Sequence, residues 1–174
     1  MGWIQTILTV MAVFVHAQSD SACHTMLERT DGSRAPLVAE DGKPAVVFYE
    51  DRWSTAVNQQ LKDELYSRGR RSGRLDRLHV VAVANIQHYN FFPARSIATA
   101  FIRAAETRAG IPILLDVDGM LSAPPWNLPR DGASVLVLDA TGQEVFRHTG
   151  ALDPEARERF FALLERLLGP AVAQ

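Results

Sequence analysis

The chain has 174 residues, of which 18 are Lys or Arg and 20 are Asp or Glu, and its formal net charge is −2. That length is enough for one domain with a sizeable core and short for two. The near balance of charge argues against a dedicated nucleic-acid binder, so no nucleic-acid partner is expected.

The first 17 residues have the features of a signal peptide. Residues 7–15 are almost wholly apolar, and Val15 and Ala17 occupy the two positions that a signal peptidase inspects. The apolar run is too short to span a bilayer, so no transmembrane segment is expected. No Lys or Arg precedes it, and a buried helix is the alternative, which the polar residues 18–21 disfavour. We predict cleavage near Ala17 and a periplasmic or secreted product.

The only cysteine, Cys23, lies just beyond the predicted cleavage site. A lone thiol cannot form an intramolecular disulfide, and in an oxidising compartment it stays free or pairs with another molecule. Lipid anchoring at Cys23 is the less favoured alternative, because Asp20 stands where a lipobox has an aliphatic residue.

Residues 18–36 show no periodicity and are expected to form a flexible lead-in to a domain over 37–168. Residues 45–49 form an uninterrupted β-branched and aromatic run, which is typical of a strand covered on both faces. A helix is then expected with Ser54 as its cap and a stripe of apolar residues on one face. That stripe comprises Val57, Leu61 and Leu65.

A second buried strand is predicted over 78–84, and a second helix begins near Pro93 and ends at Gly110. We expect its inner face to carry Ile97, Phe101 and Ala105. Strand, helix, strand and helix in this order imply parallel pairing through right-handed crossovers.

The second half of the chain has a different pattern. Residues 113–115 form a short strand, and residues 134–139 and 143–148 form a hairpin. A last helix starts at Asp153, buries Phe160 and Leu164, and leaves a C-terminal tail over 169–174. The predicted fold class is α/β, a βαβα–ββα chain with a central mixed sheet and helices on both faces. The predicted core comprises Val47, Val81, Val135, Val137, Phe101, Phe160 and Leu164.

Residues 111–119 and 133–150 resemble the second half of thioredoxin-like periplasmic proteins, most closely the YtfJ-like family of small exported bacterial proteins. The segments 126–133 and 150–155 add to this resemblance, which covers about 37–168. It implies a thioredoxin-like fold for the whole domain.

The catalytic signature of thioredoxins is missing. The CxxC motif belongs at the exit of the first central strand, where residues 50–57 hold no cysteine, and Ala133 stands where the superfamily has its cis-proline. Thiol–disulfide exchange and peroxidase chemistry are therefore not expected. No cofactor is predicted, and the histidines are too scattered for a metal site.

The carboxyl ends of parallel strands meet at one pole of such a sheet, the usual place for ligands. We expect a candidate ligand-binding pole there, for an unknown protein or small-molecule partner. Its residues are Glu50, Asp51, Arg52, Trp53, Asn85, His88, Tyr89 and Ala133. An enzyme that uses Asp51 and His88 as an acid–base pair is the alternative function. The simpler interpretation is that residues 50–52 solvate a loop and Trp53 packs beneath it.

A cluster of arginines follows the first predicted helix, and it could contact anionic lipid. The simpler interpretation is a solvated loop. The cluster comprises Arg68, Arg70, Arg71, Arg74 and Arg77. Oligomeric state has no signature in the sequence.

Overall fold

The structure is a computed structural model that describes residues 25–38 and 41–170. The predicted signal peptide, its cleavage site and Cys23 lie outside these residues. Within them, no helix is both long enough and apolar enough to cross a membrane.

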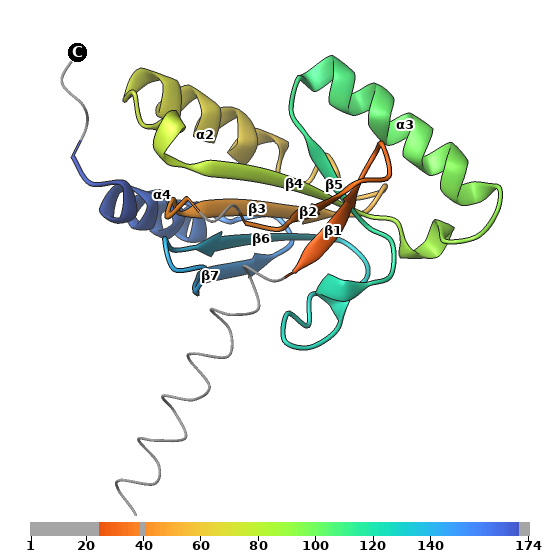
Figure 1. Ribbon diagram of the computed structural model, residues 1–174. Helices are drawn as coiled ribbons and strands as arrows, with labels where there is room; N and C mark the ends of the chain where they lie inside the picture. Colours follow the sequence, from red (N-terminus) through yellow and green to blue (C-terminus); the bar gives the residue numbers. More distant parts are fainter. Residues whose placement is uncertain (1–24, 39–40, 171–174) are drawn as a thin grey trace, which may run out of the picture.

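A seven-stranded mixed sheet forms the centre of the molecule, in the order β2-β1-β5-β4-β3-β6-β7 (Figure 1). The central strands β3, β4 and β5 are parallel, and β6, β7, β1 and β2 run antiparallel to their neighbours. The strands are β1 Met26–Arg29, β2 Arg34–Pro36, β3 Ala45–Glu50, β4 His79–Asn85, β5 Ile113–Asp116, β6 Ala133–Leu138 and β7 Glu144–Thr149.

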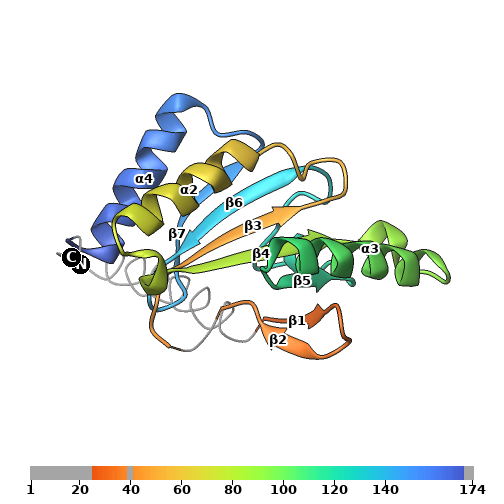
Figure 2. The ribbon, with the colours of Figure 1, turned by 90° about the horizontal axis from the view of Figure 1, so that it is seen from above.

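Three α-helices, α2 Gln59–Arg71, α3 Ala94–Ala109 and α4 Pro154–Leu168, complete the thioredoxin-like α/β fold that the sequence predicts. They all lie over one face of the sheet, as Figures 1 and 2 show from two directions. The reason is topological: both crossovers, β3 to β4 and β4 to β5, advance toward the same edge, and right-handed connections then place both helices on one side. The sequence predicts helices on both faces of the sheet, whereas the structure has them on one face.

The opposite face is covered by the segment after β5, which includes the short 3₁₀-helix η3 (Met120–Ser122). Its Leu121, Trp126 and Leu128 pack in one buried cluster with Val47 and Tyr49 of β3. On the helical face, Val46 and Phe48 pack in a second cluster with α2 and α4. Alternation along β3 thus sends successive side chains into two different cores.

Several predicted elements are confirmed. The hairpin is β6 and β7, and the core residues Val47, Val135, Val137, Phe160 and Leu164 are buried, with Val81 partly buried. The side chain of Asp153 accepts a hydrogen bond from the amide of Ala156 at 2.7 Å, which makes it the N-cap of α4.

Three expectations were wrong. Within 18–36, where a flexible lead-in was expected, residues 26–29 and 34–36 form β1 and β2; strands of four and three residues are too short to show periodicity. The first helix starts at Gln59, not beside Ser54, because a turn tied to Asp51 occupies the residues between. Phe101 is 72 % exposed and belongs to no core cluster.

Candidate ligand-binding site

Glu50 is the last residue of β3, and it lies in register between Ala84 of β4 and Ala133 of β6. Its side chain points to the helical face and is buried, with Oε2 2.6 Å from the ammonium of Lys62 on α2. Burial raises the pKa of the Glu50 carboxyl above its ordinary value, although Lys62 acts in the opposite direction. Oε1 has no hydrogen-bond partner.

Asp51 organises the loop that follows. Its carboxylate accepts hydrogen bonds from the backbone amides of Trp53 at 2.9 Å, Ser54 at 2.8 Å and Gly132 at 3.0 Å. Burial alone would raise the pKa of Asp51, but the hydrogen bonds from Gly132 and Ser54 outweigh it, and the pKa lies below its ordinary value. The carboxylate is thus engaged in loop structure.

Arg52 and Trp53 project from the same loop. Trp53 is 80 % exposed, so it does not pack under the loop, and the Arg52 guanidinium lies 5.1 Å from the centre of its ring. Among the described residues, no carboxylate lies within ion-pair distance of Arg52.

Asn85, the last residue of β4, is buried and holds two loops in place. Its amide nitrogen donates to the carbonyl of Arg130 at 2.6 Å, and its amide oxygen accepts from the backbone and side chain of Gln87. Ala133 is also buried, and its carbonyl accepts from the amide of Gly150. Through these hydrogen bonds, both residues fix the backbone of the loops that form the pole.

Asp51 and His88, the pair that the alternative function requires, have different partners in the structure. The His88 Nε2 atom lies 3.1 Å from a carboxylate oxygen of Asp131, and both of these side chains are largely exposed. Asp51 instead bonds backbone amides, because its position after β3 directs it into the turn rather than across to the β4 loop. The alternative acid–base enzyme loses its geometric basis.

An open cavity of about 440 Å³ lies at the pole, between the loop after β3 and helix α3. Five of the eight predicted site residues line it: Glu50, Asp51, Arg52, Asn85 and Tyr89. Trp53, His88 and Ala133 do not. Its other walls are mostly apolar and come from the loop after β3, from β4 and the residue after it, and from α3: Thr55, Ala84, Ile86, Ala94, Ile97, Ala98, Phe101, Ile102 and Ala105.

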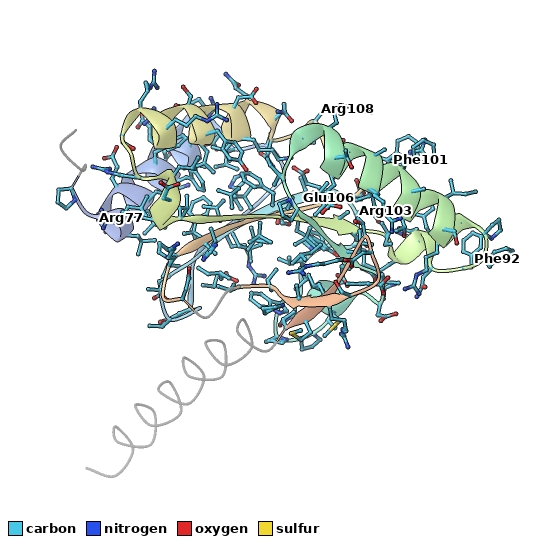
Figure 3. The ribbon with its side chains drawn as sticks, turned by 45° about the horizontal axis from the view of Figure 1, so that its top comes forward. Arg77, Phe92, Phe101, Arg103, Glu106 and Arg108 are labelled. Atoms are coloured by element: carbon cyan, nitrogen blue, oxygen red, sulfur yellow. The ribbon has the colours of Figure 1, made fainter. Side chains whose placement is uncertain are left out.

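The α3 residues are not among the predicted site residues. Ile97, Phe101 and Ala105 share one face of the helix, as predicted, but this face lines the cavity instead of joining the core. The missed signal was the run of alanines at positions 94, 98, 105 and 109, which are too small to fill the space against the sheet. Figure 3 shows Phe92 and Phe101 projecting from the α3 side of the molecule.

Two other features noted in the sequence have structural roles. Asp116, in the segment 111–119, is fully buried and accepts hydrogen bonds from the amides of Met120 and Leu121. In the arginine cluster, Arg68 pairs with Glu64 at 2.6 Å and lies over the ring of Phe161. Part of that cluster is therefore engaged within the fold.

Solved structures that share this fold include those of the following three proteins. The exposed lipoprotein thioredoxin Etrx1 of Streptococcus pneumoniae is 18 % identical, with a TM-score of 0.60, over 82 % of this chain and 98 % of its own. StoA of Bacillus subtilis is 15 % identical with a TM-score of 0.54, over 81 % and 96 %. A thioredoxin-family thiol:disulfide interchange protein of Chlorobium tepidum is 15 % identical with a TM-score of 0.55, over 83 % and 93 %.

No protein-family model matches the chain, and no curated protein matches its sequence. At these identities the structural likeness establishes the fold and nothing finer. The chain has one cysteine where a thioredoxin mechanism requires two, so it cannot form an intramolecular dithiol pair. The chain has a thioredoxin-like fold.

Proposed function

We propose that this protein is an exported, YtfJ-like thioredoxin-fold module that binds a ligand at the carboxyl pole of its sheet and performs no dithiol chemistry. The observation that carries the proposal is the cavity of about 440 Å³ lined by Glu50, Asp51, Arg52, Asn85 and Tyr89. Its volume lies within the range of ligand pockets, about 300–1,000 Å³, and its mixture of apolar walls and few polar groups is typical of them.

The position of the cavity supports a binding role. It lies at the carboxyl ends of β3 and β4, where open α/β sheets usually hold ligands. The Oε2 atom of Glu50 pairs with Lys62, and the Asp51 carboxylate accepts from backbone amides. A binding module needs no free acid or nucleophile there.

Binding of a neutral, environment-sensitive dye, N-phenyl-1-naphthylamine, tests this proposal. We expect its fluorescence to rise with the parent protein and not with Ala98→Trp, whose new side chain would fill the cavity from α3. Ala100→Trp, on the exposed side of the same helix, is the matched control and should behave as the parent. Equal dye binding by the parent and Ala98→Trp would contradict the proposed site.

Export is the second part of the proposal, and it rests on residues 1–17 of the sequence. Mass spectrometry of the mature N-terminus should find cleavage near Ala17 and an unmodified Cys23. A diacylated Cys23 in the membrane fraction would instead indicate a lipoprotein.

A further inference from the structure

A second open cavity, of about 450 Å³, lies farther along β4 between α2 and α3. Its floor comes from β3 and β4 and its walls from the two helices and the start of β5. The lining residues that it does not share with the first cavity include Phe48, Lys62, Tyr66, Val80, Ala82 and Ile113.

The two cavities meet. Both are lined by Glu50, Thr55, Ala84, Ile102 and Ala105, which come from β3, the loop after it, β4 and α3. They therefore form one elongated depression over β4, which we call the β4 groove. It runs from Arg52 at the pole to Ile113 at the start of β5, so its occupant must be long and narrow.

The chemistry of the groove favours a hydrocarbon chain over a peptide as its occupant. At Ala82, Val83 and Ala84 the backbone of β4 is paired with β3 on one side and β5 on the other, so this stretch of the floor has no free edge for a peptide to join. On the rim, Gln59 and Asp63 bond to each other at 2.9 Å. A peptide would leave many of its own N–H and C=O groups without partners, whereas a hydrocarbon chain carries none.

Charge at the pole end favours an anionic head group. Asp51 and Glu50 already have partners, and Arg52 is the charged residue at this mouth that has no carboxylate within ion-pair distance among the described residues. Its guanidinium is exposed beside Trp53 and suits bidentate binding of a carboxylate or phosphate.

We infer that the β4 groove binds the hydrocarbon chain of an anionic amphiphile and that Arg52 binds its carboxylate or phosphate head. This inference rests on the proposed binding function and names the ligand class for the same site. The hydrocarbon chain and the head group of the amphiphile contribute separately to binding, so each contribution can be tested separately.

The contribution of the hydrocarbon chain is tested by measuring the binding of dodecanoate and its shorter homologues by calorimetry, below their micelle concentrations. Each CH₂ removed should weaken binding about fourfold. Ala105→Phe blocks the junction of the two cavities and should weaken dodecanoate binding about tenfold or more. Ala104→Phe is the control, because Ala104 is exposed on α3 and lines neither cavity. Both variants are checked for an unchanged thermal melt.

The contribution of the anionic head group is tested with the variant Arg52→Ala. This variant should bind dodecanoate about tenfold more weakly than the parent and bind neutral dodecanol equally well. Arg108→Ala, an exposed arginine on α3 (Figure 3), should change neither. Dodecyl phosphate, tested beside dodecanoate, identifies whether a phosphate or a carboxylate head is preferred.

The outcomes separate this inference from the function on which it rests. If N-phenyl-1-naphthylamine binds and neither dodecanoate nor dodecyl phosphate displaces it, the site is real and the amphiphile class is wrong. If Ala105→Phe binds dodecanoate as tightly as the parent does, the chain does not lie in the groove. If neither dye nor amphiphile binds the parent, both the inference and the proposed function fail.

Discussion

The helical face of the sheet has two halves that differ in how they are covered. Over β3 and β6, α2 and α4 bury Leu61, Phe160 and Leu164 against the strands. Over β4 and β5, α3 buries no residue completely, and Ile97 and Phe101 remain exposed. One half is closed core, and the other is an open groove.

The apolar packing of α3 is slight, with Ile102 against the cluster of Ile86, Leu115 and Val117, and polar contacts add to it. Arg95 pairs with Glu28 of β1 at 2.7 Å, Arg103 donates to the carbonyl of Thr30, and Glu106 accepts from the hydroxyl of Thr30. These contacts tie one side of α3 to the β1–β2 hairpin and leave its alanine-rich side over β4 free. The comparison indicates that an amphipathic helix can face an open groove as well as a core.

The largest expected difference between the halves is in stability. Leu164→Ala removes methyl groups that are 4 % exposed, and it should lower the free energy of unfolding by about 2–5 kcal/mol. Phe101→Ala, in the open half, should change it by about 0.5 kcal/mol or less. Urea melts measure both. Similar losses in the two variants would show that α3 packs as tightly as α4.

A smaller effect is expected at the pole itself. Asp51→Ala removes the acceptor for three backbone amides and should cost about 1 kcal/mol, as the loss of a helix cap does. His88→Ala removes an exposed side chain and should cost about 0.5 kcal/mol or less. A cost at His88 equal to that at Asp51 would indicate that the two residues act together after all.

The pH dependence of stability tests the burial of Glu50. Because its pKa is raised in the folded protein, its ionisation lowers stability as the pH rises from the ordinary value of 4.5 through the folded value. Glu50→Gln cannot ionise, so the parent should lose stability relative to this variant as the pH rises above 4.5. The contribution of Asp51 has the opposite sign, is complete above its ordinary pKa of 3.8, and cancels in the comparison. A relative gain by the parent would show that Lys62 outweighs burial.

No change is expected in thiol chemistry. The parent should reduce insulin in the presence of dithiothreitol, or consume peroxide with a thiol donor, at the same rate as Cys23→Ala, because this sequence has no second cysteine. Turnover above that control would assign a redox role to Cys23.

The strands and helices of both halves were predicted from the sequence, but the open groove over β4 was not. The run 45–49, the 134–148 hairpin and the cap at Asp153 have strong local signals, and each lies where it was predicted. Glu50, Asp51, Arg52, Asn85 and Tyr89 were placed at one pole by strand order alone. Phe101 was misassigned because helical periodicity shows which residues share a face but does not show what covers that face.

Two further features needed the three-dimensional arrangement. Lys62, the partner of Glu50, lies 12 residues away on α2, and no local pattern links the two. The strands β1 and β2 are stabilised by pairing with each other and with β5, which is distant in sequence, so their short runs carry no signal of their own.

Hydrogen exchange of α3 and α4 tests the central claim, that one half of the helical face is an open binding groove, most directly. In the free protein, the amides of α3 should exchange through smaller opening free energies than those of α4, because α3 has little buried apolar contact. Addition of N-phenyl-1-naphthylamine should slow exchange in α3 and leave α4 unchanged. Equal protection of the two helices, with no response to the dye, would contradict the account.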